Sequence, residues 1–533
     1  MPTLNWIGKE SVVNHDKEVP FRLLKKIKSL SVGDNSQNLI IHGDNLEALK
    51  ALMPYYQGKI KCIYIDPPYN TGNEGWVYND KVNSPKIKKW LGKVVGGEAE
   101  DLCRHDKWLC MMYPRLKLLR DLLSDDGVIF VSIDDNEQYN LRSISEEIFG
   151  EDNFIAQLIW KKKSGGGSDT KYFAIDHEYV LVYAKNEKMQ KRYFVSLTEQ
   201  LKADYKYKDD NYNKLGPYKR KNLYQTGIET NRPNLKYEII APNGSKILPP
   251  TIWRWSKETF LEAKKQGKID FIKNRKGEWQ IFTKMYLYDE EGEEYEIKPR
   301  SILLDVGMTK DGNREIEEIF GKKIFNYPKP SSLIKFLISV VSSKNDVILD
   351  SYAGSGTTGH AVLQINKEDK GNRKFILIQL EEETGEDINI DGKKLDKVID
   401  ITRERIKRCI KLYDYNDGFE YCELDKQLFN EDGQIEEECS FEQLATYIYF
   451  TETNTNLDKK AIKKHFIGEY NEIEYYLLFK EKGKNILNKD FLKKLGKDKK
   501  KRVIYADKCL IDDKTLERHN IQFKQIPYEV KIY

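Results

Sequence analysis

The fold of this chain is decided by a strand that runs directly into a double-proline turn, Ile60-Lys61-Cys62-Ile63-Tyr64-Ile65-Asp66-Pro67-Pro68-Tyr69. The apolar run favours a strand covered on both faces, as in a parallel sheet. Because proline cannot donate to a ladder, the strand has to end at Ile65 and a stiff loop has to follow. Ligands bind at this edge of open α/β sheets. The sequence therefore predicts a functional loop at Asp66 to Tyr69, against the plain alternative of a strand-capping turn.

A second strand flows into a glycine turn and a helix, Asp350-Ser351-Tyr352-Ala353-Gly354-Ser355-Gly356-Thr357-Thr358-Gly359. Its strand starts at Asp346, its helix runs from about Thr358 to Ile365, and another buried strand follows at 374–378. Glycines let the backbone approach a cofactor closely. The turn also fits the G-x-G-x-x-G pattern, and the acidic Glu381 comes after the next strand, near the spacing for gripping ribose hydroxyls. The motif alone leaves a nicotinamide dehydrogenase open.

Further apolar runs extend the sheet, which we expect to be mainly parallel. Strands are predicted at 38–41, 128–133 and 179–183, with a helix over 45–52. The segment from roughly 187 to 300 changes to a Tyr-, Trp-, Lys-, Asn- and Gly-rich composition and is too long for a loop. The last segment is again α/β-like, with strands at 474–479 and 502–505. We expect domains at 1–186, 187–300, 301–412 and 413–533.

The composition, with 39% hydrophobic and 33% charged residues in 533, is that of a globular protein. No apolar run approaches the roughly 18 residues that span a bilayer, so no membrane association is expected. The seven cysteines contain no Cys-x-x-Cys pair. They indicate neither a disulfide framework nor a zinc site, so we expect no metal and a reduced, cytoplasmic setting. Since the net charge is only +4, any nucleic-acid surface requires local clusters of Lys and Arg.

Such a cluster lies in the segment 187–300, where lysines and tyrosines interleave over 202–232. This pattern is typical of nucleic-acid modules, although the tyrosines could equally fill a thin core. The candidate DNA-binding residues are Lys219, Arg220, Lys221 and Arg254, the last within a Trp253-Arg254-Trp255 corner. The stretch Lys81 to Lys93 is a candidate phosphate-binding lid. No Gly-Lys pair in the sequence is followed by Ser or Thr, so no motor is predicted.

These motifs together resemble the β-class amino-methyltransferases and, more narrowly, the modification (Mod) subunits of type III restriction-modification systems. The similar stretches are 39–49, the double-proline loop through Asn73-Glu74, Tyr78-Asn79-Asp80, 126–135, Tyr327-Pro328-Lys329-Pro330, the glycine turn through 362, and 373–381. The double-proline and glycine motifs are specific to the methyltransferase class. The flanking stretches point to the type III branch.

The resemblance implies a Rossmann-like α/β methyltransferase fold, circularly permuted so that the catalytic half precedes the cofactor half. A target-recognition insert and a small α/β C-terminal domain complete it. It also implies S-adenosylmethionine as cofactor and double-stranded DNA as substrate. A homodimer and a separate ATP-dependent restriction (Res) subunit are the expected partners. The expected catalytic residues are Asp66, Pro67, Pro68 and Tyr69. The expected cofactor-binding residues are Asp44, Pro328, Lys329, Asp350, Tyr352, Ala353, Gly354, Ser355, Gly356, Thr357, Thr358 and Glu381.

The double-proline loop suits methylation of the N6 amine of adenine, a poor nucleophile because its lone pair is delocalised into the ring. Asp66 and the Pro67 carbonyl can each accept one amine hydrogen and so free the lone pair. The base has to be flipped out of the duplex, and Tyr69 offers a face on which it can stack. Asp350 can face the cofactor's ammonium group. Asp44 either accepts from the cofactor's adenine or caps the helix that follows.

Three alternatives stay open. The same site can serve N4 of cytosine, although Asp rather than Ser before the prolines favours adenine by resemblance. The chain can be a solitary adenine methyltransferase without a restriction partner. It can also be a DNA-binding subunit with a vestigial site, which the intact Asp66, Tyr69 and glycine turn oppose.

Overall fold

A computed structural model of the chain describes residues 3–34, 36–71, 92–93, 103–165, 170–225, 232–384, 387–429, 434–436, 439–480, 485–495, 500–527 and 530. Most of the expected lid, Lys81 to Lys93, lies outside these residues, as do Gly72 to Glu74 and Tyr78 to Asp80 of the motif stretches. The described chain divides into two compact units, residues 1–191 with 300–533, and residues 192–299.

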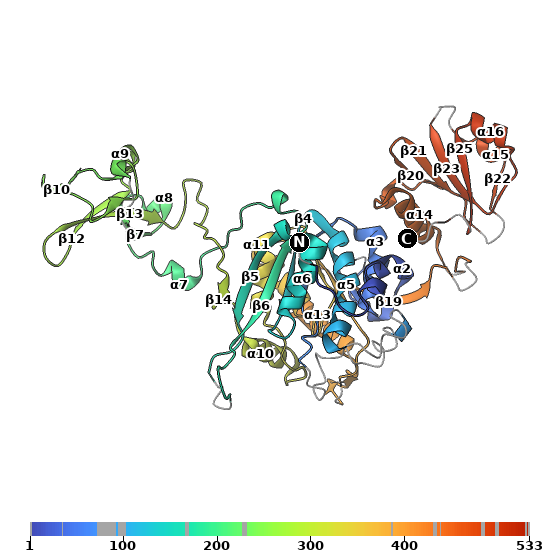
Figure 1. Ribbon diagram of the computed structural model, residues 1–533, viewed down its shortest axis with the longest axis horizontal. Coiled ribbons are helices and arrows are strands. Elements are labelled where there is room, and N and C mark those ends of the chain that lie inside the picture. The colour runs from blue at the N-terminus through green and yellow to red at the C-terminus, as the bar shows by residue number, and fades with distance from the viewer. Residues whose placement is uncertain are drawn as a thin grey trace. The chain divides into compact units, whose positions relative to one another are not determined.

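The centre of the first unit is a ten-stranded mixed sheet (Figure 1) with the order β1-β19-β2-β16-β15-β3-β4-β6-β5-β14. The strands from β19 to β4 are parallel to one another, and β5 is parallel to β14. β6 runs antiparallel to both β4 and β5, and β1 runs antiparallel to β19. The sheet is therefore mainly parallel, with antiparallel pairs on both sides of β6 and at β1–β19. Its strands are β1 (Arg22–Lys26), β19 (Glu420–Gln427), β2 (Leu39–His42), β16 (Lys374–Gln379), β15 (Val347–Asp350), β3 (Ile60–Ile65), β4 (Leu123–Ile133), β6 (His177–Ala184), β5 (Phe154–Lys161) and β14 (Ile302–Leu303).

Helices cover both faces of this sheet. Because side chains alternate along a strand, neighbouring residues of β16 lie on opposite faces of the sheet and show what covers each face. Ile376 and Ile378 share a core with α3 (Asn45–Tyr56), α5 (Arg104–Leu122) and α6 (Gln138–Phe149). Leu377 instead lies against Gly359 of α12 (Thr357–Asp369), beside α11 (Ser331–Val341) and α13 (Val398–Leu412). This double covering explains the continuous apolar runs of the strands.

The second unit, 192–299, lies inside the expected insert. Its largest sheet has the antiparallel strands β12 (Ile269–Lys273), β13 (Trp279–Tyr286) and β7 (Tyr218–Asn222). The unit also contains three helices, α7 (Glu199–Lys202), α8 (Tyr212–Leu215) and α9 (Lys257–Lys265). Two short strand pairs join β8 (Tyr224–Gln225) to β11 (Ile252–Trp253) and β9 (Ile239–Ile240) to β10 (Lys246–Ile247). The small core around Trp253 and Phe260 gives the unit a fold of its own.

The C-terminal segment corrects our boundary at residue 413. β19 belongs to the main sheet, because α13 carries the chain over to a strand parallel to β2, where Tyr421 and Cys422 are buried. A separate small sheet follows, with α14 (Phe441–Thr453) packed beside it. Its strands are β20 (Phe466–Tyr470), β21 (Ile473–Leu477), β23 (Lys501–Ala506) and β25 (Ile521–Gln525). No helix in the described part of the chain is long and apolar enough to cross a membrane.

Candidate active site

The double-proline loop follows β3, at the point in the sheet where the connections of neighbouring strands go to opposite faces. β3 lies between β15 and β4, and Asp66 follows its last residue. β15 leads into α12 on one face, whereas the chain after β3 leads to α5 on the other face. Neighbouring parallel strands whose connections go to opposite faces open a crevice at their carboxyl ends. Asp66 and Asp350, the last residue of β15, lie at this crevice.

Asp66 lies in a cluster of charged groups. The Lys329 ammonium donates to both of its carboxylate oxygens, at 3.0 and 2.9 Å. The Tyr69 hydroxyl lies 2.8 Å from Asp66 Oδ1 and 3.1 Å from Glu178 Oε2, so two carboxylates share its proton. The same ammonium lies 3.3 Å from Glu178 Oε2 and donates to the Tyr69 hydroxyl at 2.8 Å. Two carboxylates thus compete for one lysine and one phenol.

The electrostatics of this cluster favour its charged form. Burial alone would lower the pKa of Lys329, but Asp66 and Glu178 outweigh burial and raise it. Burial would raise the pKa of Glu178, but Lys329 and Lys162 hold it below its usual value. For Tyr69, burial and the two carboxylates act together and raise the pKa well above its ordinary value. The phenol is therefore neutral, and the ammonium group stays charged between its carboxylates.

Two of our expectations look different in this geometry. Lys329 was predicted to bind the cofactor, but the structure gives its ammonium protein carboxylates as partners, which a buried cation requires. Tyr69 was predicted to offer a stacking face, but only 6% of it is exposed. The Trp108 indole donates to the Pro68 carbonyl at 2.7 Å and fixes the loop. Within the described residues no donor reaches the Pro67 carbonyl.

A cavity of about 50 Å³ joins the double-proline loop to the glycine turn. It brings together ten of the predicted site residues, namely Asp66, Pro328, Lys329, Asp350, Tyr352, Ala353, Gly354, Ser355, Thr357 and Thr358. Tyr64, Phe325 and Tyr327 complete its lining. Burial raises the pKa of Asp350 to about 7, against the hydrogen bonds from the Thr358 hydroxyl and the Tyr352 amide. A buried carboxyl group of this kind gains from a cation placed beside it.

Asp44 and Glu381 line a second, larger pocket of about 810 Å³ at the same edge of the sheet. Asp44 caps α3 by accepting from the Leu46 amide at 2.8 Å, which gives the capping alternative direct structural support. Glu381 pairs with Lys397. Gln379, the last residue of β16, accepts from the Gly354 amide at 2.8 Å and so links this strand end to the glycine turn. Asp44 and Glu381 come two residues after β2 and β16, and Asp350 ends β15, the next strand of the sheet.

Gly356 does not line the cavity. It caps α12 with a left-handed φ of 82°, and a Cβ there would lie 3.2 Å from the methyl group of Thr402 on α13. The glycine therefore serves the packing of the turn against α13.

This packing predicts a difference between two glycine variants. We expect Gly356→Ala to lower the free energy of unfolding more than Gly392→Ala does. Both positions have a left-handed φ, which costs alanine about 1–2 kcal/mol, but nothing lies within 4 Å of a Cβ at Gly392. Urea denaturation followed by circular dichroism measures both. Equal losses would show that Thr402 yields to the added methyl group.

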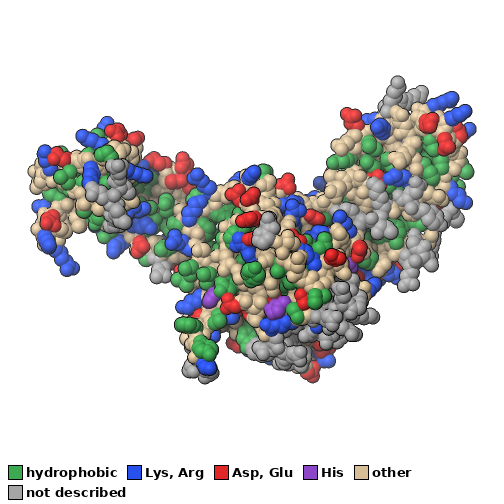
Figure 2. Space-filling view, in the orientation of Figure 1, with side chains coloured by type: hydrophobic (Ala, Val, Ile, Leu, Met, Phe, Trp, Pro, Cys, Tyr) green, Lys and Arg blue, Asp and Glu red, His purple; other side chains and the backbone are tan. Residues whose placement is uncertain are grey.

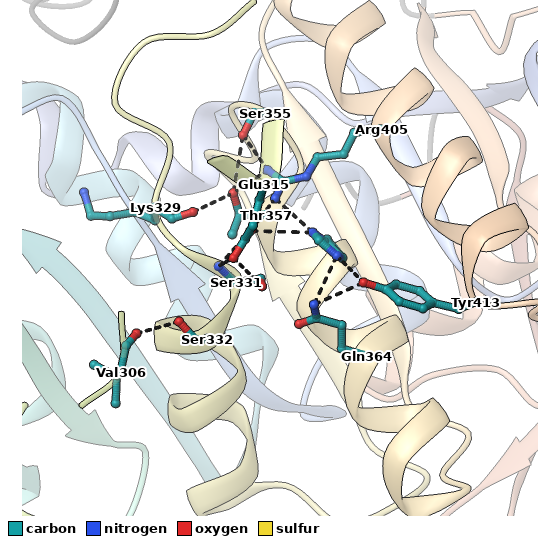
Figure 3. A network of polar contacts seen from close by, with 11 residues as sticks. Val306, Glu315, Lys329, Ser331, Ser332, Ser355, Thr357, Gln364, Arg405 and Tyr413 are labelled. Carbon is teal, nitrogen blue, oxygen red and sulfur yellow. Dashed lines mark hydrogen bonds and ion pairs between the residues drawn. The ribbon is translucent and has the colours of Figure 1, made fainter. Parts of the chain in front are cut away.

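The buried Arg405 binds the side chains of the glycine turn through hydrogen bonds (Figure 3). The Arg405 guanidinium donates to Ser355 Oγ at 2.9 Å and to Thr357 Oγ1 at 2.8 Å. It also donates to Glu315 at 3.1 Å and to His360 Nδ1 at 2.9 Å. Burial and Arg405 hold the pKa of His360 well below its usual value, so the ring is neutral and can accept this bond. The Thr357 hydroxyl donates to the Lys329 carbonyl, which joins the turn to the segment carrying Lys329.

Sequence reasoning missed both Glu178 and Arg405. Glu178 precedes the apolar run of β6, and only its long-range contacts give it a place at the site. Arg405 does leave a signal, since it falls at helical spacing among the buried Ile401, Thr402 and Cys409 of α13. A charged residue on the buried face of a helix needs partners, and these are at the glycine turn.

The candidate DNA-binding residues differ in their exposure and in the contacts that their side chains make within their unit. Arg220 is paired with Asp270 at 2.7 Å and lies over the Tyr207 ring. Lys219 lies partly buried over the Tyr205 ring, at 4.5 Å. Lys221 and Arg254 are exposed. Trp253, which precedes Arg254, is buried in the small core, and its indole donates to the Tyr237 carbonyl.

Comparison with known proteins places this geometry in a family. The family model described as DNA methylase matches residues 60–390. The chain is 34% identical over 391 residues to the type III restriction-modification enzyme StyLTI Mod subunit of Salmonella typhimurium, covering 71% of this chain and 58% of that protein. It is 32% identical to the EcoPI Mod subunit of Escherichia phage P1, covering 77% and 68%. The chain thus spans little more than half of the first relative's length.

Among solved structures, the PvuII DNA methyltransferase (cytosine-N4-specific) aligns with 71% of this chain and 92% of its own, with 12% identity and a TM-score of 0.34. The family match excludes the dehydrogenase alternative, and the resemblance drawn from the motifs is confirmed. The chain belongs to the DNA methylase family and is a relative of the type III Mod subunits.

Proposed function

We propose that this chain is a site-specific DNA methyltransferase that methylates N6 of a flipped-out adenine with S-adenosylmethionine. We further propose that it is the modification subunit of a type III-like restriction-modification system. One observation carries the proposal. The Asp66 carboxylate and the Pro67 carbonyl, two acceptors for one amine, lie on the loop that shares a cavity with the glycine turn.

The residues at the sheet edge fit S-adenosylmethionine. Asp350, Glu381 and Asp44 lie at the ends of three adjacent strands, about 5 Å apart, in an order that suits an ammonium group, ribose hydroxyls and an adenine amine. The buried Asp350 carboxyl is stabilised in its charged form by an ammonium group. When bound, the cofactor supplies an electrophilic methyl group on a sulfonium centre.

The chain's own residues prepare the amine. Asp66 and the Pro67 carbonyl accept its two hydrogens and so direct the nitrogen lone pair away from the ring. For this, Asp66 has to give up Lys329, which occupies both of its oxygens. Glu178 lies 3.3 Å from the same ammonium and can keep it when Asp66 turns to the base. The cavity of about 50 Å³ is small for a ligand of this size, so we infer that Lys329 and Tyr327 move as the site fills.

Adenine rather than cytosine is the proposed base because Asp66 precedes the prolines and because type III Mod subunits, 31–34% identical, are among the relatives. N4 of cytosine is the second candidate, since an exocyclic amine with two hydrogens meets the same two acceptors. The unit 192–299 is the proposed target-recognition insert of a circularly permuted fold, with Lys221 and Arg254 as its exposed DNA-binding candidates. A homodimer and a Res partner remain proposals drawn from resemblance to the family.

Single-molecule sequencing of DNA from cells that express the chain tests the proposal. We expect N6-methyladenine at one short motif, absent from cells that express Asp66→Ala. The method reports the base, the motif and the strand together. N4-methylcytosine would favour the second candidate, and unmodified DNA would contradict both.

A further inference from the structure

The segment between β5 and β6, residues 162–176, is called the hairpin here, and its described residues present aromatic side chains to solvent. Its base is closed by the amides of Lys162 and Lys163, which donate to the Asp176 carbonyl at 2.9 and 3.4 Å. Beyond this base, Tyr172 is 80% exposed, Phe173 92% and Ile175 48%. Figure 2 shows hydrophobic and basic side chains on this projection, which lies below β5 and β6 in Figure 1. These apolar side chains are therefore exposed to solvent and not buried in a core.

The charge around these side chains is basic. Lys163 and Lys171 are exposed, and the Lys171 ammonium lies 5.2 Å from the centre of the Tyr172 ring. Single exposed apolar residues are common on protein surfaces, but two adjacent aromatic rings beside a lysine, on a segment with a second exposed lysine, are the pattern of surfaces on which bases stack and phosphates bind. The pattern therefore favours a nucleic acid over an apolar protein surface as the partner.

The hairpin starts at the active site. Its first residue, Lys162, donates to Glu178 at 3.1 Å, and Glu178 contacts Lys329 and Tyr69 beside Asp66. Five peptide units separate Phe173 from Glu178, so the Cα atom of Phe173 lies at most about 18 Å from that of Glu178 in the catalytic cluster. A base that enters the site leaves its place in the duplex at a distance of this order.

We propose that Tyr172 and Phe173 form a wedge that enters the base stack of double-stranded DNA where the target base leaves it. This inference rests on the proposed function, because only an enzyme that flips a base creates such a gap. Side chains of other DNA-binding proteins insert between base steps and stabilise the unstacked duplex. An aromatic ring that replaces the lost stacking partner shifts the flipping equilibrium toward the extrahelical base. The lysines at the base of the hairpin then lie along the phosphates.

The test compares two duplexes that carry the motif found by sequencing. In one the target base is paired, and in the other it faces an abasic site and is already free to leave the helix. We expect Tyr172→Ala/Phe173→Ala in the full chain to lower single-turnover methylation of the paired duplex about ten- to hundredfold. The second duplex should restore most of the wild-type rate, because flipping no longer limits it. Tyr139→Ala removes an aromatic side chain that is 72% exposed on α6 and should leave both rates unchanged.

Fluorescence of 2-aminopurine at the target position gives an independent readout. The double variant should show a smaller increase on binding the paired duplex than the wild type does. Unchanged methylation and fluorescence would overturn the wedge, as would an equal loss on both duplexes, which indicates a structural role. A change only in the sedimentation of the free protein would assign the surface to a second chain and overturn it as well. If the wild type methylates neither duplex, the proposed function fails first and the wedge falls with it.

Discussion

Asp66→Ala is expected to lower the rate of methyl transfer at least about 10³-fold while S-adenosylmethionine still binds. The carboxylate is one of two groups that accept the hydrogens of the target amine, and loss of one preorganised hydrogen-bonding group at a reacting centre costs about 10²–10³ in rate. Asp66 also carries charge, so its loss should lie at the upper end or beyond. Transfer of a tritiated methyl group to DNA measures the rate, and calorimetry measures cofactor binding.

The structure explains why the Asp66 variant should still fold. Lys329, the main partner of Asp66, keeps Glu178 as a counter-ion at 3.3 Å, so no buried charge is left alone. Asp66→Asn preserves the shape of the side chain but exchanges a charged acceptor for a neutral amide, and it should also be severely impaired. Activity of either variant within tenfold of the wild type would contradict the catalytic role of Asp66.

The parts of the fold that the sequence predicts are those with strong local signals. The strands β2, β3, β15 and β16 are continuous apolar runs that end in motifs, and the structure places them within a residue of the predicted bounds. β14 has two residues and no such signal, and β19 was assigned to the wrong domain because nothing local marks its pairing with β2. Long-range pairing is what a single sequence leaves open.

In the candidate site too, the sequence predicts what depends on local signals and leaves long-range contacts open. Parallel strands carry their carboxyl ends to one edge, so the meeting of Asp66 with Asp350 could be predicted from strand ends alone. The partner of Lys329 could not, since its ammonium reaches across from the segment before α11 to β3 and β6. In the unit 192–299, composition predicted basic and aromatic residues but could not separate the buried Tyr205 and Tyr218 from exposed ones.

Glu178→Gln should reduce kcat about ten- to hundredfold at saturating cofactor and DNA. With a neutral side chain at this position Asp66 becomes the only carboxylate left to Lys329, so Asp66 is released less easily to the base. A hydrogen bond to a charged group is worth about 1.5–3 kcal/mol, which is the origin of the expected range. Steady-state kinetics measure kcat and KM separately, and kcat should carry most of the loss. Glu368→Gln removes the carboxylate of an exposed ion pair with Lys335 and should change kcat less than twofold.

A double-mutant cycle separates this competition from a plain loss of structure. If Glu178 acts by keeping Lys329 away from Asp66, its removal should matter little once Lys329 is gone. Lys329→Met alone leaves the carboxylates of Asp66 and Glu178 close together without their cation, and it should be impaired for that different reason. The double variant Glu178→Gln/Lys329→Met relieves that repulsion and should be more active than the product of the two single effects predicts. Additive losses would mean that Glu178 and Lys329 act independently, and Glu178 would then be a structural partner of Lys162 and Tyr69 rather than the group that receives Lys329.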